Sequence, residues 1–191
     1  FFRPGAISTG SLATFSYDAP TIDVLASGTQ TTVQDYPGRI GYWEVGIPPS
    51  GPMDHLSFRL ANRLVGNPEG SAGLEITVSG PTLKFNRATE IALTGAPLPA
   101  TLNDGTVAHG VPVKIVAGDI LKIGSGGSQP GVRAYLSVKG GLEVPDYLGS
   151  KSTFTLGQFG GHGGRALRTG DVLHLAEAPS GPSSSAPAGL L

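Results

Sequence analysis

Short segments in which apolar and polar residues alternate recur along most of this chain, and turns rich in glycine and proline separate them. The segment LEITV at 74–78, for example, alternates three apolar residues with Glu75 and Thr77. A period of two is typical of a strand with one face in the core and one in water. Many short strands predict a mainly β fold, either a closed β-barrel or a barrel-like sandwich. We expect strands at 21–25, 74–78, 82–85, 90–94, 100–102, 106–108, 111–116, 120–123 and 132–138, with a hairpin turn at 103–105.

One segment breaks this pattern and predicts a single principal α-helix at about residues 52–65. Pro52 suits the first turn, where its missing N–H costs nothing, and Ser50 or Gly51 is expected to cap the exposed amides. Asp54 lies in the same turn, where the helix dipole favours a carboxylate. The sequence GNP at 66–68 is expected to end the helix. The expected apolar face comprises Met53, Leu56, Leu60, Ala61 and Leu64, and the polar face or its margin holds Arg59, Asn62 and Arg63.

The length of 191 residues favours one domain with an extension at each end. We expect a linker or strap at residues 1–20, a folded domain at 21–176, and a flexible linker rich in proline, serine and alanine at 177–191. The N-terminal phenylalanine and the trailing linker suggest a piece of a longer protein whose second half is missing. Within the domain, AGDILKI at 117–123 matches TGDVLHL at 169–175, through either a weak repeat or reuse of one turn chemistry.

The composition limits the classes of partner. A formal net charge of −1 gives no electrostatic footprint for nucleic acid or an anionic membrane surface. No apolar run approaches the roughly 20 residues that span a bilayer. The chain has no cysteine, which excludes disulfides and thiolate chemistry and is consistent with a cytosolic protein. The four histidines show no metal-ligand spacing, so we expect no metal site, and His174 is expected to face outward from a strand.

The densest polar cluster precedes the expected helix. Gln34, Asp35 and Arg39 surround a YPG turn, and a second turn, PPSGP, follows a short way along the chain. A loop so rich in proline and glycine has few backbone conformations, so it holds side chains at modest entropic cost, as a ligand site requires. Asp35 and Asp54 could form a carboxylate pair across this loop, or one of them could form an ion pair with Arg39 or Arg59.

A second polar cluster is the glycine-rich segment GGHGGR at 160–165. Its unhindered backbone amides, with His162 and Arg165, could wrap an anionic or carbonyl group. The alternative is a flexible loop with an exposed histidine, and spacing alone does not separate the two. The segment is not a phosphate-binding P-loop, because no GKS or GKT follows it. On a neighbouring strand, Glu75 could pair with Arg63 or Lys84.

Several long motifs together resemble one known family, allophanate hydrolase subunit 2, over about residues 20–176. The motifs are GTQTTVQDYPGRIGYWEVGIPPSGPMD (28–54), FRLANRLVGN (58–67), LEIT (74–77), ALTGAP (92–97) and GSKSTFTLGQFGGHGGRAL (149–167). This family supplies part of the carboxyltransferase domain of urea carboxylase and of fused urea amidolyase. The wording DYPGRIGYW and VGIPPSGPMD is similar to urea carboxylase. A related subunit of 5-oxoprolinase shares the TTVQD, ALTGA and glycine-rich elements.

The resemblance implies a cyclophilin-like closed β-barrel and a carboxyl-transfer reaction. In such enzymes another domain uses ATP and bicarbonate to make carboxybiotin, and a biotin carrier domain delivers it to the site where urea becomes allophanate. The implied partners are therefore urea, the carrier domain and the adjoining carboxyltransferase subdomains, and the chain alone is expected to be inactive. Two alternatives remain, one of the subunits of a 5-oxoprolinase complex and a non-catalytic interaction module that docks through the loop at 36–43.

The implied reaction also suggests which residues form the site. It needs a base for a poorly nucleophilic urea nitrogen, donors for the urea carbonyl, and a dry pocket that protects the carboxyl donor. We expect Asp35, Asp54 and His162 as catalytic residues. The expected substrate-binding residues, on the same reasoning, are Gln34, Arg39, Asn62, Lys139, Gly160, Gly161 and Arg165.

Overall fold

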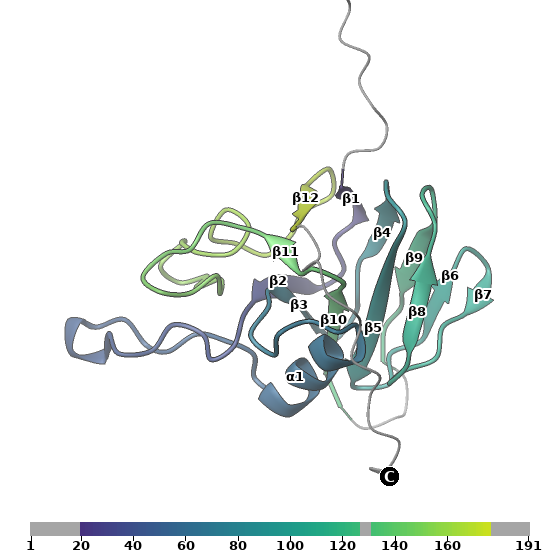
Figure 1. The fold of residues 1–191 in the computed structure, drawn as a ribbon. Helices are drawn as coiled ribbons and strands as arrows, with labels where there is room; N and C mark the ends of the chain where they lie inside the picture. Colours follow the sequence, from purple (N-terminus) through teal and green to yellow (C-terminus); the bar gives the residue numbers. More distant parts are fainter. Residues whose placement is uncertain (1–19, 127–130, 177–191) are drawn as a thin grey trace, which may run out of the picture.

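A computed structural model describes residues 20–126 and 131–176, and within them the fold is mainly β, as predicted (Figure 1). The extensions expected at 1–20 and 177–191 lie, apart from residue 20, outside the described residues. The elements are β1 (Thr21–Ala26), β2 (Gln30–Gln34), the 3₁₀ turn η1 (Trp43–Val45), α1 (His55–Leu64), β3 (Gly73–Thr77), β4 (Thr82–Phe85), β5 (Thr89–Gly95), β6 (Ala100–Leu102), β7 (Gly105–Thr106), β8 (Pro112–Ile115), β9 (Ile120–Ile123), β10 (Arg133–Val138), β11 (Leu142–Glu143) and β12 (Val172–Leu175).

The strands form two antiparallel sheets. The larger has the order β11-β12-β1-β4-β9-β6-β7, so β1 lies between the last strand described and β4. Thr21 pairs with His174 in this sheet, which brings the two ends of the described chain together. The smaller sheet has the order β2-β3-β10-β5-β8, with β10 at its centre. Its neighbours β3 and β5 both pair antiparallel with β10.

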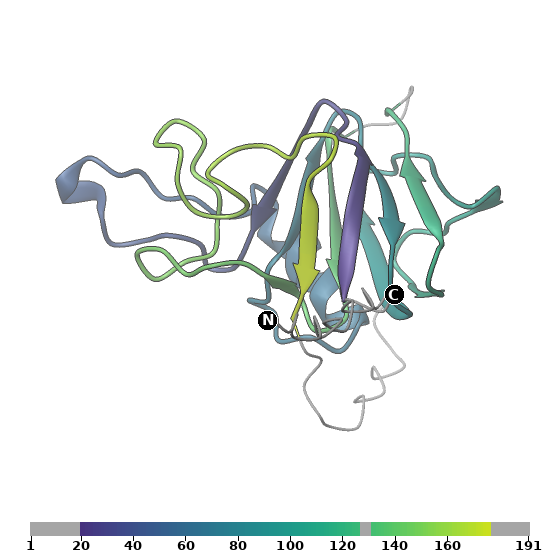
Figure 2. The same ribbon diagram turned by 90° about the horizontal axis from the view of Figure 1, so that it is seen from above.

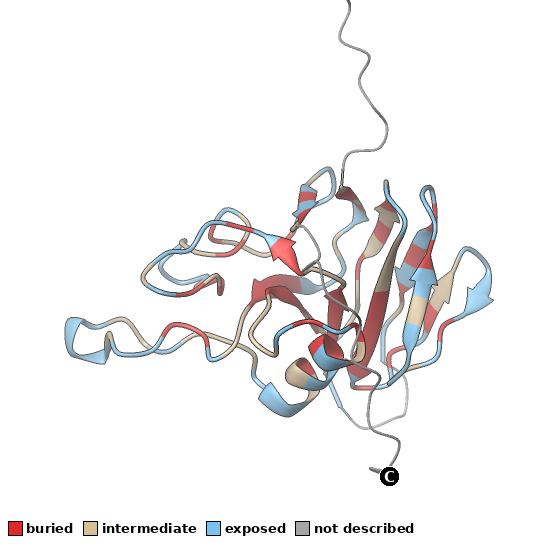
Figure 3. Ribbon diagram, in the orientation of Figure 1, coloured by how far each residue is buried: buried red, intermediate tan, exposed pale blue. Residues whose placement is uncertain are grey.

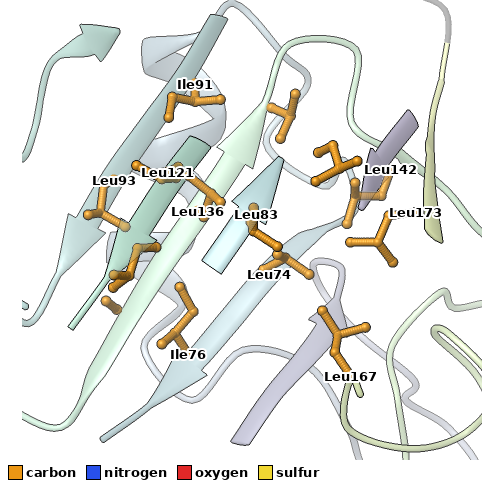
Figure 4. Close-up of a cluster of buried hydrophobic side chains, with 14 of the residues drawn as sticks. Leu74, Ile76, Leu83, Ile91, Leu93, Leu121, Leu136, Leu142, Leu167 and Leu173 are labelled. Atoms are coloured by element: carbon orange, nitrogen blue, oxygen red, sulfur yellow. The ribbon is translucent and has the colours of Figure 1, made fainter. Parts of the chain in front are cut away.

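The core lies between the two sheets and takes side chains from both (Figure 4). Ile22 and Leu83 come from the larger sheet, and Leu74, Leu93 and Leu136 come from the smaller one. All five are at most 1% exposed. Burial of this apolar surface is the main source of stability for a sandwich of short strands. Figure 3 shows the same contrast across the molecule, with buried residues concentrated in the central strands.

The helix α1 covers the outer face of the smaller sheet. It packs against β5 and β10, and Phe58 lies edge-on to Tyr135 with ring centroids 5.9 Å apart. Because α1 covers one face of β10 and the core covers the other, every residue of this strand from Ala134 to Val138 is buried. A strand buried on both faces holds its neighbours firmly, and the loops that follow β2 and precede β3 start from this rigid base.

The helix differs from its prediction in its start and in its buried face. It begins at His55, and the cap is Asp54 rather than Ser50 or Gly51, because Asp54 Oδ1 accepts hydrogen bonds from the amides of Leu56 and Ser57. Ala61 is buried as expected, whereas three residues of the expected apolar face are exposed, namely Met53, Leu56 and Leu60. Phe58 and Asn62 are buried instead. The helix ends as predicted, with Gly66 in the left-handed region after the capping residue Val65.

The strand predictions are confirmed in all their positions to within a residue or two, including the hairpin β6-β7, whose loop is Asn103-Asp104. β2 and β11 are additional strands that the alternation did not reveal. His174 is exposed on β12 as expected. The two GD segments share one turn chemistry: Asp119 accepts from the amide of Val116, and Asp171 accepts from the amide of Arg168, each 2.8 Å away.

Two long loops project from the same side of the sandwich in both ribbon views (Figures 1 and 2). We call residues 35–54 the proline loop and residues 144–171 the glycine loop. The proline loop connects β2 to α1 and carries η1 at its tip, and the glycine loop connects β11 to β12. Arg39 and Ser50 exchange two backbone hydrogen bonds, which join the two arms of the proline loop into a hairpin.

Candidate functional site

The proline loop and the glycine loop are joined through Arg39, whose side chain is 1% exposed. Its guanidinium donates to three carbonyl oxygens of the glycine loop, those of Tyr147 (3.0 Å), Ser150 (3.2 Å) and Ser152 (3.1 Å). It also donates to Ser50 Oγ at 2.9 Å, and it lies over the ring of Phe159 at 4.9 Å from the centroid. Arg39 forms no ion pair with a carboxylate in the part of the chain that the structure describes. Burying a cation is costly unless polar groups surround it, and here backbone dipoles supply that environment.

Asp35 contacts the same segment of the glycine loop from the other side. Its Oδ1 accepts from the hydroxyls of Ser150 and Ser152, both at 2.6 Å, and its Oδ2 accepts from the amide of Lys151 at 2.8 Å. The Asp35 amide in turn donates to Ser152 Oγ at 3.0 Å. Asp35 therefore binds the donors of this segment, whereas Arg39 binds its acceptors. The carboxylate pair of Asp35 with Asp54 and the ion pairs with Arg39 or Arg59 do not form among the described residues.

The glycine-rich segment packs directly against this clamp. The Gly161 amide donates to the Lys151 carbonyl at 3.0 Å. A Cβ on Gly160 would lie 2.1 Å from the Ser152 carbonyl oxygen, and one on Gly161 would lie 1.9 Å from Thr153 Oγ1. Both glycines have positive φ angles. Glycine is therefore required at these two positions for conformation and for space.

His162 and Arg165 meet at Asp171, a residue of the TGD turn that sequence reasoning did not select as a site residue. Arg165 binds Asp171 in a bidentate manner, with contacts of 2.7 and 2.8 Å, and His162 Nε2 lies 3.6 Å from Asp171 Oδ2. The hydrogen bonds from Arg165 lower the pKa of Asp171 to about 2. The guanidinium that was expected to hold a ligand thus has a carboxylate partner. The repeat of the GD turn is the signal in the sequence that could have drawn attention to Asp171.

Asp54 and its neighbours fasten the second arm of the proline loop to the smaller sheet. The Asp54 amide donates to the Tyr135 hydroxyl at 2.7 Å, and the Met53 amide donates to Glu75 Oε2 at 2.7 Å. Tyr135 donates to the same Glu75 oxygen at 3.0 Å, and burial raises the pKa of its phenol. Glu75 has Arg133 as its ion-pair partner, 3.6 Å away, so the partners considered from the sequence, Arg63 and Lys84, are wrong. The hydrogen bond from the Ser57 hydroxyl lowers the pKa of Asp54.

The remaining expected site residues lie at other positions around the smaller sheet. Gln34 is buried at the end of β2, where its Nε2 donates to Thr32 Oγ1 at 3.0 Å and its Oε1 has no partner in the described residues. Asn62 is fully buried, not on the polar face, and its amide binds the Ser71 carbonyl at 2.9 Å. Lys139 follows β10 and binds Glu90 Oε2 at 2.6 Å.

The structure thus brings together one group of the expected residues at the junction of the two loops. This group contains Gln34, Asp35, Arg39, Gly160 and Gly161, with His162 and Arg165 further along the same glycine-rich segment. Asp54, Asn62 and Lys139 have hydrogen-bonding partners outside this junction. Ser150 and Ser152, which are both fully buried, belong to the junction although the sequence did not single them out.

Two further observations concern the described residues as a whole. They contain no cluster of three or more histidine, cysteine, aspartate or glutamate residues that could hold a metal ion. In the same ranges, no helix is long and apolar enough to cross a membrane. The tip of the proline loop is apolar and exposed, with Trp43 70% and Val45 71% accessible.

Comparison with known proteins places these loops in a family context. The family model described as carboxyltransferase domain, subdomain A and B, matches residues 45–189. The urea amidolyase of Lachancea kluyveri is 47% identical over 186 residues, which cover 97% of this chain and 10% of that protein. A 5-oxoprolinase subunit of Escherichia coli is 39% identical over 156 residues, which cover 82% of this chain and 49% of that protein. The chain thus spans about a tenth of the urea amidolyase that it matches.

A solved structure gives the same relationship. The Kluyveromyces lactis urea carboxylase is 51% identical and superposes with a TM-score of 0.85, over 93% of this chain and 16% of that one. The expected resemblance to this carboxyltransferase region is therefore confirmed in sequence and in fold. The similarity to the 5-oxoprolinase subunit is real but more distant.

Proposed function

Because the chain belongs to the carboxyltransferase domain, subdomain A and B family, we propose that it forms part of the carboxyltransferase domain of a biotin-dependent urea carboxylase or urea amidolyase. The observation that carries this proposal is the match to urea amidolyase at 47% identity over 97% of the chain, against 39% over 82% for the 5-oxoprolinase subunit. The proposed reaction moves a carboxyl group to a nitrogen of urea and gives allophanate. Biotin, when bound, supplies that carboxyl group from a separate carrier domain.

His162 is the best candidate for the proton acceptor among the three catalytic residues expected. Its imidazole is half-buried beside Asp171, which can orient the ring. Asp54 is a weaker candidate, because its carboxylate caps α1 and hydrogen bonds lower its pKa. Asp35 already accepts three hydrogen bonds from the glycine loop, so its main role in this proposal is to hold that loop.

The junction of the two loops offers groups that suit a urea or a ureido ligand. Gln34 Oε1 is buried and without a partner among the described residues, and it is an acceptor of the kind that an N–H group needs. The glycine-rich segment at 160–164 supplies backbone amides close to it, as donors for a carbonyl oxygen. In this proposal Gln34, Gly160 and Gly161 lie nearest the ligand, Arg39 and Arg165 shape the loops, and Asn62 and Lys139 support the sheet beneath.

The whole enzyme is expected to need more than this chain. We propose that ATP and bicarbonate are used by another domain, and that the biotin carrier and the adjoining carboxyltransferase subdomains complete the site. The chain alone would then be inactive, and the parent protein would be cytoplasmic. The family relationship also supports the proposal that the two sheets together form a cyclophilin-like closed barrel.

The test is urea-dependent ATP hydrolysis by the full-length parent, purified with its biotin attached and with 5-oxoproline as the competing substrate. We expect urea to stimulate hydrolysis and allophanate to form. Stimulation by 5-oxoproline instead would favour a role in a 5-oxoprolinase complex. Stimulation by neither would leave the urea assignment untenable.

A second candidate function is a non-catalytic interaction module, which the exposed apolar tip at Trp43 and Val45 favours. The two candidates differ in what they predict for the loop junction. An interaction module would tolerate substitution of Asp35, Arg39 and Arg165 without any change in urea turnover by the parent protein. The carboxyltransferase proposal requires turnover to fall in each of these variants.

A further inference from the structure

Lys151 lies in the middle of the segment that Asp35 and Arg39 hold, and no step of the function described above uses its side chain. The segment is Ser150-Lys151-Ser152 in the glycine loop. Both serines are fully buried, whereas Lys151 is half-buried. The ammonium group of Lys151 has no hydrogen-bond or ion-pair partner in the ranges that the structure describes.

All the other polar groups around Lys151 are already paired. The Lys151 amide donates to Asp35 Oδ2 at 2.8 Å, and the Lys151 carbonyl accepts from the Gly161 amide at 3.0 Å. The hydroxyls of Ser150 and Ser152 both bind Asp35, and their carbonyls both bind Arg39. The backbone that carries Lys151 is therefore fixed on both sides by buried charged groups.

The cations nearby differ from Lys151 in that each is already engaged. Arg39 donates to carbonyl oxygens, Arg165 binds Asp171 in a bidentate manner, and Lys139 binds Glu90. Lys151 is thus the cation at the loop junction that remains available for an anionic ligand. An ammonium is a compact charge that binds carboxylates strongly through charge-assisted hydrogen bonds.

We propose that Lys151 Nζ binds the carboxylate group of the reaction, and that it contacts this group in the product allophanate. This inference rests on the proposed function, because it takes its ligand from the carboxyl transfer to urea. It assigns to Lys151 the anion-binding role that the sequence suggested for Arg165. The clamp of Asp35 and Arg39 then has a clear purpose, since it sets the position of one lysine while both of its own charges stay buried.

Binding of malonamate to the full-length parent urea carboxylase tests the proposal without turnover. Malonamate has the shape of allophanate with CH₂ in place of NH, so it keeps the carboxylate and does not react. We expect Lys151→Met to weaken malonamate binding by about 10- to 100-fold, the effect of losing one charge-assisted hydrogen bond. Lys151→Arg should retain most of the affinity. Malonamide, the neutral analogue, should bind equally to the original protein and to Lys151→Met.

The matched control is Lys84→Met, because Lys84 is also half-buried and lies on β4 of the larger sheet, away from the loops. It should leave malonamate binding unchanged. Thermal melting of each variant shows whether it folds, and Lys151→Gln replaces Lys151→Met if the latter does not. Unchanged malonamate affinity in a folded Lys151→Met or Lys151→Gln variant would overturn the proposal.

Turnover separates this proposal from the function on which it rests. If urea stimulates ATP hydrolysis in the original protein but malonamate binding does not depend on Lys151, only the role of Lys151 fails. If urea gives no stimulation in the original protein, the proposed function fails, and loss of malonamate binding in Lys151→Met still identifies a carboxylate site. In the first case Lys151→Met should also leave urea-dependent turnover unchanged.

Discussion

At the scale of single residues, Asp171 organises the far end of the glycine loop. It binds Arg165 through two hydrogen bonds, accepts a third from the Arg168 amide, and lies close to His162. A carboxylate held in this way favours its charged form, which is why its pKa falls to about 2. The charge of Asp171 is therefore part of the folded structure at neutral pH.

We expect Asp171→Asn to lower the free energy of unfolding at pH 7 by roughly 1.5–3 kcal/mol, the value of hydrogen bonds to a charged group. Because the folded pKa is depressed, this contribution is complete above the unfolded pKa of about 3.9 and is lost as the pH falls towards about 2. Thermal melting of both proteins between pH 7 and pH 2 measures the difference. A difference that stays constant over this range would contradict the assignment.

At the scale of elements, the helix and the two loops show which features the sequence could predict. The strands and the helix end were predictable because alternation, glycine and asparagine signal them locally. The buried face of α1 was not, because Leu56 and Leu60 fit a helical stripe as well as Phe58 does. The choice between the two stripes depends on Tyr135 of β10, which is far away in the chain.

The site was predictable only in its parts. Asp35, Arg39 and the glycine-rich segment were selected from turn chemistry and family motifs, and the structure brings them together. The partners of Arg39 were not predictable, because they are backbone carbonyls, which no sequence pattern specifies. The capping role of Asp54 and the pairing of Arg165 with Asp171 likewise depend on backbone geometry that only the folded chain defines.

The buried face of α1 can be tested directly. Phe58 is fully buried against Tyr135, whereas Leu56 is 67% exposed one turn or less away. We expect Phe58→Ala to lower the free energy of unfolding by about 3–5 kcal/mol, through lost burial and a residual cavity. Leu56→Ala should change it by no more than about 0.5 kcal/mol. Denaturant titration of the two variants measures both values, and equal losses would mean that the helix packs through another face.

The contact between the glycine-rich segment and the clamp allows a second test at this scale. Gly160 and Gly163 both have positive φ angles, +71° and +66°, so alanine strains the backbone at either position. A Cβ at Gly160 would also meet the Ser152 carbonyl at 2.1 Å and Arg39 Nη2 at 2.8 Å, whereas at Gly163 the nearest atom is 3.9 Å away. Gly160→Ala should therefore cost about 1–3 kcal/mol more than Gly163→Ala, the usual penalty for overpacking. Equal melting temperatures would show that the two loops are not in close contact.

At the scale of the whole molecule, the larger sheet joins the two ends of the described chain. β1 and β12 pair antiparallel, and the Leu175 amide donates to the Pro20 carbonyl at 2.7 Å. The fold therefore depends on the pairing of these strands, and little depends on where the chain is opened along an exposed edge. The hairpin β6-β7 lies at such an edge, and its loop residues Asn103 and Asp104 are exposed.

We therefore expect a circular permutant of residues 20–176 to fold when a short glycine-serine linker joins residues 176 and 20 and the chain is opened between Asn103 and Asp104. Exposed loop tips tolerate new termini because few backbone hydrogen bonds are lost there. The matched control is opened between Ser150 and Lys151, where the new ends would break the contacts with Asp35 and Arg39. Cooperative thermal unfolding, followed by circular dichroism, should persist in the first permutant with a melting temperature only a few degrees lower, by roughly 4–8 °C per kcal/mol lost. In the control, the transition should move to a much lower temperature or disappear. If both permutants melt alike, the loop junction does not contribute to the stability of the sandwich, and Asp35 and Arg39 must serve the site alone.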